Sequence, residues 1–364
     1  MPDLYEIVSS SGNYTIEVGS DLIGKTLKKF PQALYIIDEN LVDRFPASLT
    51  NRLVIEATEE NKALENMAPF VAALRELKAN RDTHIVAVGG GIIQDITTFL
   101  ASVYMRGLSW TYLPSTVLSM ADSCIGGKSS INVLGYKNLV GNFYPPKDIF
   151  IDISFIDTLE DDMIVGGLFE AAKICYARSP EKFKEYEALE PSASVSHANM
   201  QAIVGLALST KKWFIEVDEF DQKERLLLNF GHTFGHAIEA STNFEVHHGI
   251  GVGVGMLIAC EFAQKRTQFS DRGVQAIERL RRHILSMLVL TDGSCLGAPK
   301  IVNIASTIEK FEYDKKHKKN FYRVVVPDEN GLLVMTSINR DEASLREIEA
   351  AYRRAFEQLN WKCE

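Results

Sequence analysis

Apolar positions in the first half of the chain follow two alternating patterns. Short runs of consecutive apolar residues predict buried strands, and longer segments with an apolar residue every three to four positions predict helices. The helix-like segments cover residues 61–78 and 92–104. Because strands that alternate with helices build a parallel sheet, we predict an α/β domain. The strand-like runs cover residues 33–37, 53–55, 85–88, 110–113 and 149–153.

The pattern changes near residue 154, and helical periodicity dominates the rest of the chain. At 364 residues the chain exceeds one typical core, so we expect two domains, at 1–156 and 157–364. A single strand-like run covers residues 322–326. The helix-like segments cover residues 163–176, 200–215, 225–239, 251–266, 271–288, 301–311 and 342–359.

The segment 225–239 carries a stripe of polar side chains. On one helix at roughly 100° per residue, Arg225, Asn229, His232 and His236 fall within an arc of about 60°. Two histidines at this spacing are often ordinary polar surface, but four donors on one face favour a metal or anion site. The glycines at 231 and 235 each cost roughly 1 kcal/mol inside a helix. We therefore predict that another element packs close to this backbone.

Composition narrows the possible settings and partners. Hydrophobic residues make up 46% of the chain and charged residues 24%, which is ordinary for a globular protein. The formal net charge of −9 argues against a nucleic-acid partner. The five cysteines are scattered without metal-binding spacing, which favours a reducing compartment. With no signal-peptide pattern and no run of 18 apolar residues, we expect a cytoplasmic protein without membrane segments.

The first half also contains candidate binding loops. Gly89-Gly90-Gly91 lies between a predicted strand and helix, where backbone N–H groups can cradle a phosphate. The dinucleotide pattern is not met, since Gln94 stands where its third glycine would be, and a glycine triplet is often only a tight turn. Asp122 to Lys128 and Tyr136-Lys137-Asn138 are rich in polar groups that suit either an anion and a polyol or a solvated loop.

Three polar groupings in the second half are ambiguous when taken alone. Glu170 and Lys173 share a helix face at i, i+3, which is common on surfaces. His248 lies sixteen residues after His232 and begins another helix-like segment. The charged run Asp314 to Lys319 precedes the strand-like segment, and such runs are usually solvated.

Together these segments resemble the motifs of 3-dehydroquinate synthase and its sugar-phosphate cyclase relatives. The similarity runs from about Asp38 to Lys316, and the motifs are specific only in combination. In chain order they are Gly89 to Asp95, Tyr104 to Gly107, Leu113 to Thr116, Asp122 to Lys128, Lys137-Asn138, Gly167 to Lys173, Arg225 to His236 and His248-Gly249.

The resemblance implies a Rossmann-like, NAD-binding α/β domain followed by a mostly helical metal- and substrate-binding domain, with the active site in the cleft. It also implies tightly bound NAD and one divalent ion, zinc or cobalt, held by Glu170, His232 and His248. A carboxylate and two imidazoles leave positions open for a substrate. Both histidines must be neutral to bind the ion, so we expect the metal affinity to fall in acid.

The resemblance further assigns residues around the two small molecules. Cations dominate the substrate set, which suits a substrate with both a carboxylate and a phosphate. The residues expected around the substrate are Asp122, Lys128, Lys137, Asn138, Lys173, Lys211, Arg225, Asn229, His236 and Lys316, with Arg106. The residues expected around NAD are Asp38, Asn40, Glu59, Lys62, Gly90, Gly91, Ile92, Asp95, Ser115, Thr116, Lys128, Lys137 and Thr158.

The implied activity is a lyase reaction that consumes no NAD. In the family, the metal binds vicinal hydroxyls, NAD removes a hydride, phosphate is eliminated, the hydride returns and an intramolecular aldol reaction closes a carbocycle. Our first expectation is conversion of 3-deoxy-D-arabino-heptulosonate 7-phosphate to 3-dehydroquinate. The alternatives are a sibling cyclase for another sugar phosphate, a metal-dependent polyol dehydrogenase that would release NADH, and a binding paralogue without activity.

The chain departs from the family pattern at several positions. The family usually has Pro-Gly-Glu at Ala57-Thr58-Glu59, glycine at Gln94, and His-Gly-Glu-Ala at His248-Gly249-Ile250-Gly251. Loss of the carboxylate at Ile250 is expected to alter hydrogen bonding around His248. The family also implies a homodimer, in which Arg106 reaches into the neighbouring subunit's site.

Overall fold

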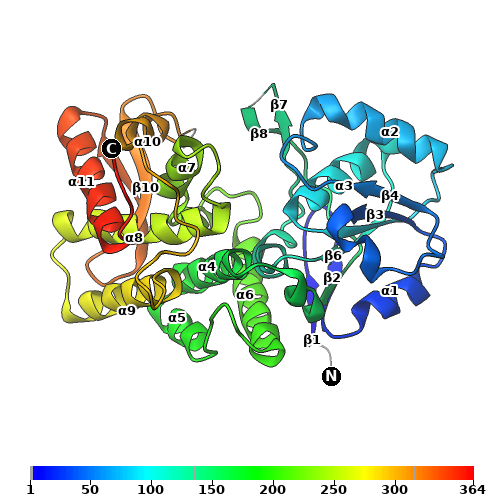
Figure 1. Ribbon diagram of the computed structural model, residues 1–364, viewed down its shortest axis with the longest axis horizontal. Helices are drawn as coiled ribbons and strands as arrows, with labels where there is room; N and C mark the ends of the chain where they lie inside the picture. Colours follow the sequence, from blue (N-terminus) through cyan, green and yellow to red (C-terminus); the bar gives the residue numbers. More distant parts are fainter. Residues whose placement is uncertain (1–2, 135, 315) are drawn as a thin grey trace. The chain divides into compact units, whose positions relative to one another are not determined.

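The computed structural model describes residues 3–134, 136–314 and 316–364, so Lys315 of the charged run lies outside the described residues. The chain forms two compact units (Figure 1). The first comprises Met1–Leu159 and Met200–Glu219, and the second comprises Glu160–Asn199 and Phe220–Glu364. Helix α6 (His197–Val217), which the sequence placed in the second domain, therefore packs mainly with the first unit.

A seven-stranded sheet is the centre of the first unit, in the order β1-β2-β9-β6-β5-β3-β4. Only the edge pair β1–β2 is antiparallel. Every residue of β3, β5 and β6 is buried, as expected for parallel strands covered on both faces. The strands are β1 (Asp3–Ile7), β2 (Tyr14–Gly19), β3 (Leu34–Asp38), β4 (Arg52–Ile55), β5 (Ile85–Gly89), β6 (Trp110–Pro114) and β9 (Asp148–Asp152).

The sheet explains where this unit can bind a ligand. From β3 the chain moves outward to β4, and then returns to the other side of β3 with β5 and β6. Ligands of open α/β sheets bind at such a reversal, beyond the carboxyl ends of the strands. Asp38 ends β3 and Gly89 ends β5, so these residues lie on either side of the switch point.

Shorter elements surround this sheet. The helices are α1 (Leu22–Lys29), α2 (Met67–Glu76) and α3 (Gly91–Val103), with 3-10 turns η1 (Glu39–Arg44), η2 (Leu64–Asn66), η3 (Tyr104–Arg106) and η5 (Ile153–Thr158) and the π-helical turn η4 (Ser119–Ser123). A small antiparallel hairpin joins β7 (Ile131–Val133) and β8 (Tyr136–Val140).

The second unit is mostly helical and is built around α8 (His248–Arg266). This helix is buried continuously from Gly249 to Ala263, as expected for a helix that is apolar on all sides. One hairpin, β10 (Phe321–Pro327) with β11 (Leu333–Asn339), completes the unit. The other helices are α4 (Asp161–Arg178), α5 (Pro180–Glu187), α7 (His232–Ser241), α9 (Asp271–Leu288), α10 (Ile304–Glu312) and α11 (Glu342–Gln358).

The prediction of one helix over residues 225–239 is wrong. A 3-10 turn, η6 (Glu224–Asn229), is followed by Phe230 and Gly231, and α7 begins only at His232. The break has a backbone cause, because Phe230 has ψ 130° and Gly231 adopts the left-handed φ of 78°. Arg225 and Asn229 therefore do not share a helical stripe with the two histidines.

The predicted close packing against the glycines of this segment is confirmed. A Cβ on Gly235 would lie 2.5 Å from the carbonyl oxygen of Gly251, and one on Gly255 would lie 2.0 Å from that of Gly231. Only glycine at these positions lets α7 and α8 approach so closely. This contact brings the first residues of the two helices, His232 and His248, together.

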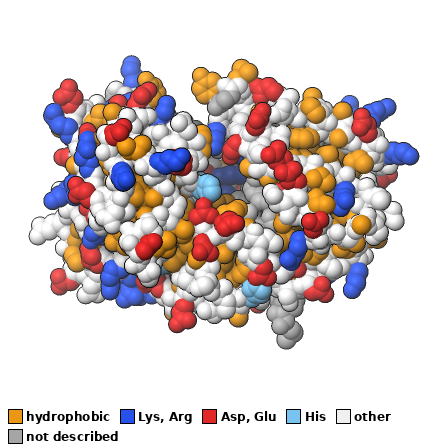
Figure 2. All heavy atoms as spheres, viewed as in Figure 1, with side chains coloured by type: hydrophobic (Ala, Val, Ile, Leu, Met, Phe, Trp, Pro, Cys, Tyr) orange, Lys and Arg blue, Asp and Glu red, His pale blue; other side chains and the backbone are white. Residues whose placement is uncertain are grey.

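Two further properties of the molecule bear on its partners. Acidic and basic side chains are interspersed on the face shown in Figure 2. Within the described ranges, no helix is long and apolar enough to cross a membrane.

Candidate active site

Three helices of the second unit bring a carboxylate and three imidazoles together. His232 and His236 lie in successive turns of α7, His248 begins α8, and Glu170 lies within α4. Glu170 Oε1 is 3.2 Å from His248 Nε2 and 3.8 Å from His232 Nε2. Nitrogen atoms of the three histidines all lie within 4.8 Å of one another.

These separations fit a single metal ion. Tetrahedral bonds of 2.0 to 2.2 Å place neighbouring ligand atoms roughly 3.4 Å apart. The distances from Glu170 Oε1 to the two Nε2 atoms, 3.2 and 3.8 Å, bracket that value. The resemblance implied Glu170, His232 and His248 as ligands, and the structure adds His236 to the candidate donors.

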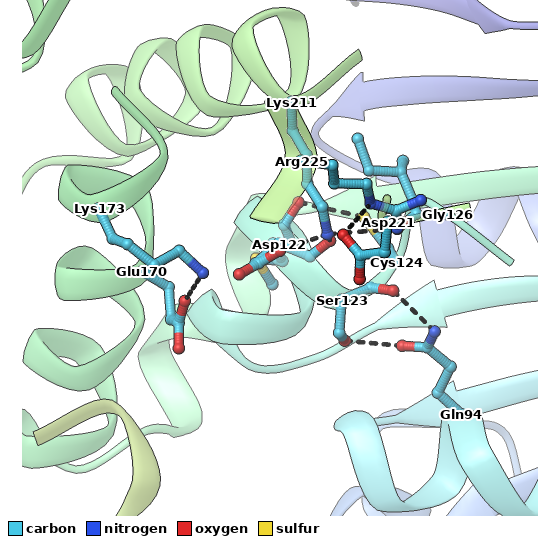
Figure 3. A network of polar contacts seen from close by, with 12 residues as sticks. Gln94, Asp122, Ser123, Cys124, Gly126, Glu170, Lys173, Lys211, Asp221 and Arg225 are labelled. Carbon is cyan, nitrogen blue, oxygen red and sulfur yellow. Dashed lines mark hydrogen bonds and ion pairs between the residues drawn. The ribbon is translucent and has the colours of Figure 1, made fainter. Parts of the chain in front are cut away.

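Hydrogen bonds orient each proposed ligand towards the proposed metal position. Lys173 donates a short hydrogen bond to Glu170 Oε2, which leaves Oε1 for the histidines (Figure 3). His232 Nδ1 donates to the Phe230 carbonyl at 3.2 Å, and His248 Nδ1 donates to Glu239 Oε1 at 3.0 Å. Both Nε2 atoms are therefore directed to the site, the usual arrangement for metal-binding histidines.

The electrostatics of the site favour occupation by a cation. Burial lowers the pKa of His232 well below its ordinary value, and the Lys173 ammonium acts in the same direction. Burial alone would lower the pKa of His248, but Glu239 and Glu170 raise it to about 10. Only neutral imidazole binds a metal, so an ion bound here would displace the His248 proton. The positive charge of the ion would then be attracted to the carboxylates of Glu170 and Glu239 in place of that proton.

His236, which the sequence assigned to the substrate, lies in the same cluster. Its Nδ1 is 3.9 Å from Asp314 Oδ2, and Lys316 Nζ is 3.6 Å from the same oxygen. Although burial raises the pKa of Asp314, His236 and Lys316 hold it well below its usual range. Lys316 thus lies on the same side of the unit as the histidines.

Arg225 and Asn229 lie on η6, and each contacts a group close to it in the chain. Arg225 is buried, with its Nε 3.7 Å from Asp221 Oδ1. Asn229 Nδ2 donates to the Leu226 carbonyl at 3.0 Å.

In the first unit, the glycine turn forms a close-packed cradle at the switch point. Gly90 caps α3, which begins at Gly91 and Ile92. A Cβ on Gly90 would meet Thr116 Cγ2 at 3.0 Å, whereas one on Gly91 would meet only Ser123 Oγ, at 3.8 Å. The space beside Gly91 is the kind that a pyrophosphate requires. Ser115 and Thr116 follow β6 directly and adjoin this turn.

Two departures from the family pattern gain a structural explanation. Gln94 Nε2 donates to the Ser123 carbonyl at 2.8 Å, and its Oε1 accepts from Ser123 Oγ at 2.7 Å (Figure 3). The glutamine therefore ties α3 to the turn that carries Asp122. Ile250 is fully buried, and Glu239 supplies the carboxylate that faces His248.

A second polar network links the hairpin β7–β8 to α3. Lys62 Nζ is 2.7 Å from Asp95 Oδ2 and donates to Asn138 Oδ1 at 3.0 Å. Lys137 Nζ is 3.7 Å from Glu59 Oε1. Burial raises the pKa of Asp95 to about 6, although Lys62 acts in the opposite direction. The structure thus brings together five of the residues that the sequence assigned to NAD or substrate.

Other first-unit residues of the predicted set lie at four different places. Lys211 of α6 donates to the backbone carbonyl of Asp122 at 2.6 Å and to its carboxylate (Figure 3). Asp38 accepts from Asn40 N at 3.1 Å, next to the switch point. Lys128 forms a β-bridge with Phe143, and Thr158 Oγ1 donates to the Phe155 carbonyl on η5.

Arg106 lies apart from the cradle. It is exposed on η3, directly after the carboxyl end of α3, whereas Gly90 and Gly91 lie at the amino end.

Sequence reasoning missed two other residues, Glu239 and Asp314, as partners of the histidines. A signal for Glu239 was present, because it lies seven residues after His232 and therefore on the same face of α7.

Comparisons with known proteins agree with this arrangement. The family described as 3-dehydroquinate synthase N-terminal matches residues 52–165, and the family described as 3-dehydroquinate synthase C-terminal matches residues 167–317. A 3-dehydroquinate synthase of Ruminiclostridium cellulolyticum is 31% identical over 347 residues, which cover 91% of this chain and 94% of that protein.

Two solved structures share the fold. A 2-deoxy-scyllo-inosose synthase complexed with carbaglucose-6-phosphate, NAD+ and Co2+ superposes with a TM-score of 0.81 at 22% identity, covering 97% of this chain and 99% of that one. A 2-epi-5-epi-valiolone synthase from Streptomyces hygroscopicus subsp. jinggangensis 5008, with NAD+ and Zn2+ bound, has a TM-score of 0.76 at 22% identity, covering 96% and 99%. The two family matches and the near full-length relative show that this chain belongs to the 3-dehydroquinate synthase family.

Proposed function

We propose that this protein is an NAD- and metal-dependent 3-dehydroquinate synthase. It converts 3-deoxy-D-arabino-heptulosonate 7-phosphate to 3-dehydroquinate and inorganic phosphate. The observation that carries the proposal is the convergence of Glu170 Oε1 with the Nε2 atoms of His232 and His248, at 3.8 and 3.2 Å. A divalent ion held by three protein ligands keeps positions open for the vicinal hydroxyls of a sugar.

The first unit contains the residues proposed to bind NAD. The glycine turn at Gly90 and Gly91, next to Asp38 at the switch point, suits the pyrophosphate and ribose of a dinucleotide. When bound, NAD would accept and return a hydride, and the metal ion would acidify a substrate hydroxyl. Both similar cyclase structures contain NAD+ and a divalent metal, which supports the same pair here.

The chain's own cations are suited to the substrate's carboxylate and phosphate. Lys211, Arg225 and Lys316 each lie near a carboxylate, that of Asp122, Asp221 and Asp314 respectively. An anionic substrate would compete for these charge-assisted contacts. Lys173 has a different role, because its bond to Glu170 Oε2 orients the metal-binding oxygen.

A sibling cyclase for another sugar phosphate is the second candidate. Gln94, Ile250 and Gly251 depart from the family pattern near the cradle and the metal ligands. The two similar structures are synthases of this sibling kind, one of 2-deoxy-scyllo-inosose and one of 2-epi-5-epi-valiolone, each at 22% identity. The near full-length 3-dehydroquinate synthase relative, at 31% identity, favours the first candidate.

One assay separates these functions. Purified protein with NAD and Zn2+ is incubated with 3-deoxy-D-arabino-heptulosonate 7-phosphate and, separately, with other ketose and hexose phosphates. We expect one phosphate released per carbocycle formed, with no net growth of NADH absorbance. Carbocycle from a different sugar phosphate would establish the sibling cyclase, and NADH growth without phosphate release would establish a dehydrogenase.

The proposed metal ligands are tested separately. Single variants Glu170→Ala, His232→Ala and His248→Ala are expected to lose bound Zn2+ and turnover, because each removes one of three protein ligands. Elemental analysis after dialysis measures the metal content, and circular dichroism checks the fold. Full metal occupancy in all three variants would place the site elsewhere.

A further inference from the structure

His248 depends on a carboxylate from the neighbouring helix. Its Nδ1 donates to Glu239 Oε1 at 3.0 Å, so Nε2 is left to face Glu170. Glu239 is buried, with 7% of its surface exposed, and its position is fixed by the close crossing of α7 and α8. A carboxylate behind a histidine fixes the tautomer and raises the basicity of a metal ligand.

The residue that leaves room for this carboxylate is Gly251. A Cβ at position 251 would lie 3.2 Å from both Cγ and Oε1 of Glu239, and Oε1 is the atom that accepts from His248. Contacts this short force the neighbouring group to move by some tenths of an ångström. Gly251 has helical backbone within α8, so its conformation does not demand glycine.

A glycine at this position lowers the helix's intrinsic stability. Alanine inside a helix is favoured over glycine by about 1 kcal/mol. Gly251 nonetheless lies beside the bond between His248 and Glu239.

We propose that Glu239 is the positioning residue of His248, and that Gly251 permits this role by leaving space for the carboxylate. The proposal rests on the metal site of the proposed function and deepens it. Glu239 does not bind the ion; it holds Nδ1 so that Nε2 meets the ion together with Glu170 and His232.

Cobalt binding tests the proposal without any turnover. The Kd for Co2+ is measured by chelator competition, and the visible absorption of the bound ion reports its ligand geometry. Glu239→Ala and Glu239→Gln are expected to raise the Kd by about 10 to 100-fold. Glu245→Gln is the matched control, since it removes an exposed carboxylate from the loop between the same helices, and it is expected to bind Co2+ like the wild type.

The decisive comparison is a double-mutant cycle with Gly251→Ala. Alone, this variant is expected to raise the Kd several-fold and to change the Co2+ spectrum, while the metal-free protein melts no lower than the wild type. In the Glu239→Ala background the same change should have no further effect, because no side chain remains to be displaced. An equal effect in both backgrounds, or unchanged affinity in Gly251→Ala, would overturn the role of Gly251.

Failure of this proposal is distinguishable from failure of the metal site. If Glu170→Ala binds Co2+ as tightly as the wild type, the metal site itself is wrong. If Glu170→Ala loses the ion while both Glu239 variants bind normally, only the positioning role is overturned. Should Gly251→Ala fail to fold, Glu239→Gln decides the matter, because it keeps the volume of the side chain and removes its charge.

Discussion

The two oxygens of Glu170 make different contacts. Oε2 accepts from Lys173, and Oε1 faces His232 and His248. Glu170 and Lys173 are 1% and 2% exposed, so neither charge is balanced by water. Removing one partner of a buried ion pair leaves the other charge uncompensated, which is far more costly than losing a surface pair.

This difference gives a prediction with an internal control. Lys173→Met should lower the unfolding free energy of the metal-free protein by about 3 to 5 kcal/mol. Lys182→Met removes the lysine of a pair with the same i, i+3 spacing, Lys182–Glu185, whose side chains are 31% and 55% exposed, and should cost under about 1 kcal/mol. Urea titrations measure both. Similar losses in the two variants would show that His248, whose Nε2 lies 3.2 Å from Oε1, compensates the Glu170 charge.

At the scale of elements, the sequence predicted the parallel strands well. Long buried apolar runs such as 85–88 have few alternatives to a central strand, and β3, β4, β5, β6 and β9 are all confirmed. The hairpin β1–β2 was missed, because polar residues such as Glu6, Thr15 and Glu17 interrupt the apolar pattern of its two strands. In the second unit, β11 was missed for the same reason.

The histidine segment shows why side-chain patterns do not fix a site. The four polar residues of this segment fit one helical face, but the helix is broken at Gly231. Glu170 of α4 and His248 of α8 complete the site in place of Arg225 and Asn229. The proposed metal ligands were grouped only through the family motifs. The spacing of Glu239 from His232 places both on one face of α7, but sequence alone does not pair Glu239 with His248 or Asp314 with His236.

Helix α9 contributes a buried histidine to the second unit. The rings of Phe169, Phe183 and Tyr186 lie roughly perpendicular to that of His283, with centroids 5.3 to 6.3 Å away. Within the described part of the chain, its Nε2 has no hydrogen-bond partner. Burial lowers the pKa of His283 from 6.5 to about 4. Between these two pH values the unfolded chain binds the proton more readily than the folded chain, so stability falls as the pH falls.

Replacing this imidazole should remove part of the acid sensitivity. Between pH 7 and pH 4.5, His283 lowers the unfolding free energy by about 2 to 3 kcal/mol. His283→Phe keeps a ring against the three aromatic neighbours and has no proton to bind. Between pH 7 and pH 4.5, the His283→Phe variant should therefore lose about 2 to 3 kcal/mol less unfolding free energy than the wild type. Urea titrations at both pH values measure the difference. An unchanged loss would mean that His283 is protonated in the folded protein.

At the scale of the whole molecule, the chemistry is divided between the two units. The residues assigned to NAD all belong to the first unit, and the proposed metal ligands all belong to the second. Arg106 belongs to neither the NAD set nor the metal set, and it lies at the opposite end of α3 from the glycine turn. The 13 residues of α3 separate the two ends by roughly 20 Å, so Arg106 does not serve the phosphates of NAD in its own chain.

The backbone around Arg106 is strained in a way that points to a function. Met105 and Arg106 have left-handed φ values of 51° and 72°, and Gly107 follows with φ 124°. Two consecutive non-glycine residues in this region cost of order 1 kcal/mol or more each. A turn that merely ended a helix would not need them. Together with its exposure, this supports our proposal that the enzyme is a homodimer in which Arg106 reaches the partner's substrate phosphate.

Subunit mixing tests this proposal. Arg106→Ala should raise the KM for the sugar phosphate while NAD and Zn2+ bind normally, and His232→Ala should be inactive through loss of the metal. In a mixed dimer, one site has an intact metal ligand set from the first variant and an intact Arg106 from the second. Random exchange of equal amounts makes half of the dimers mixed, each with one intact site, so activity should recover to about a quarter of the wild type. A monomer by light scattering, or no recovery after exchange is shown with labelled subunits, would reject the shared site.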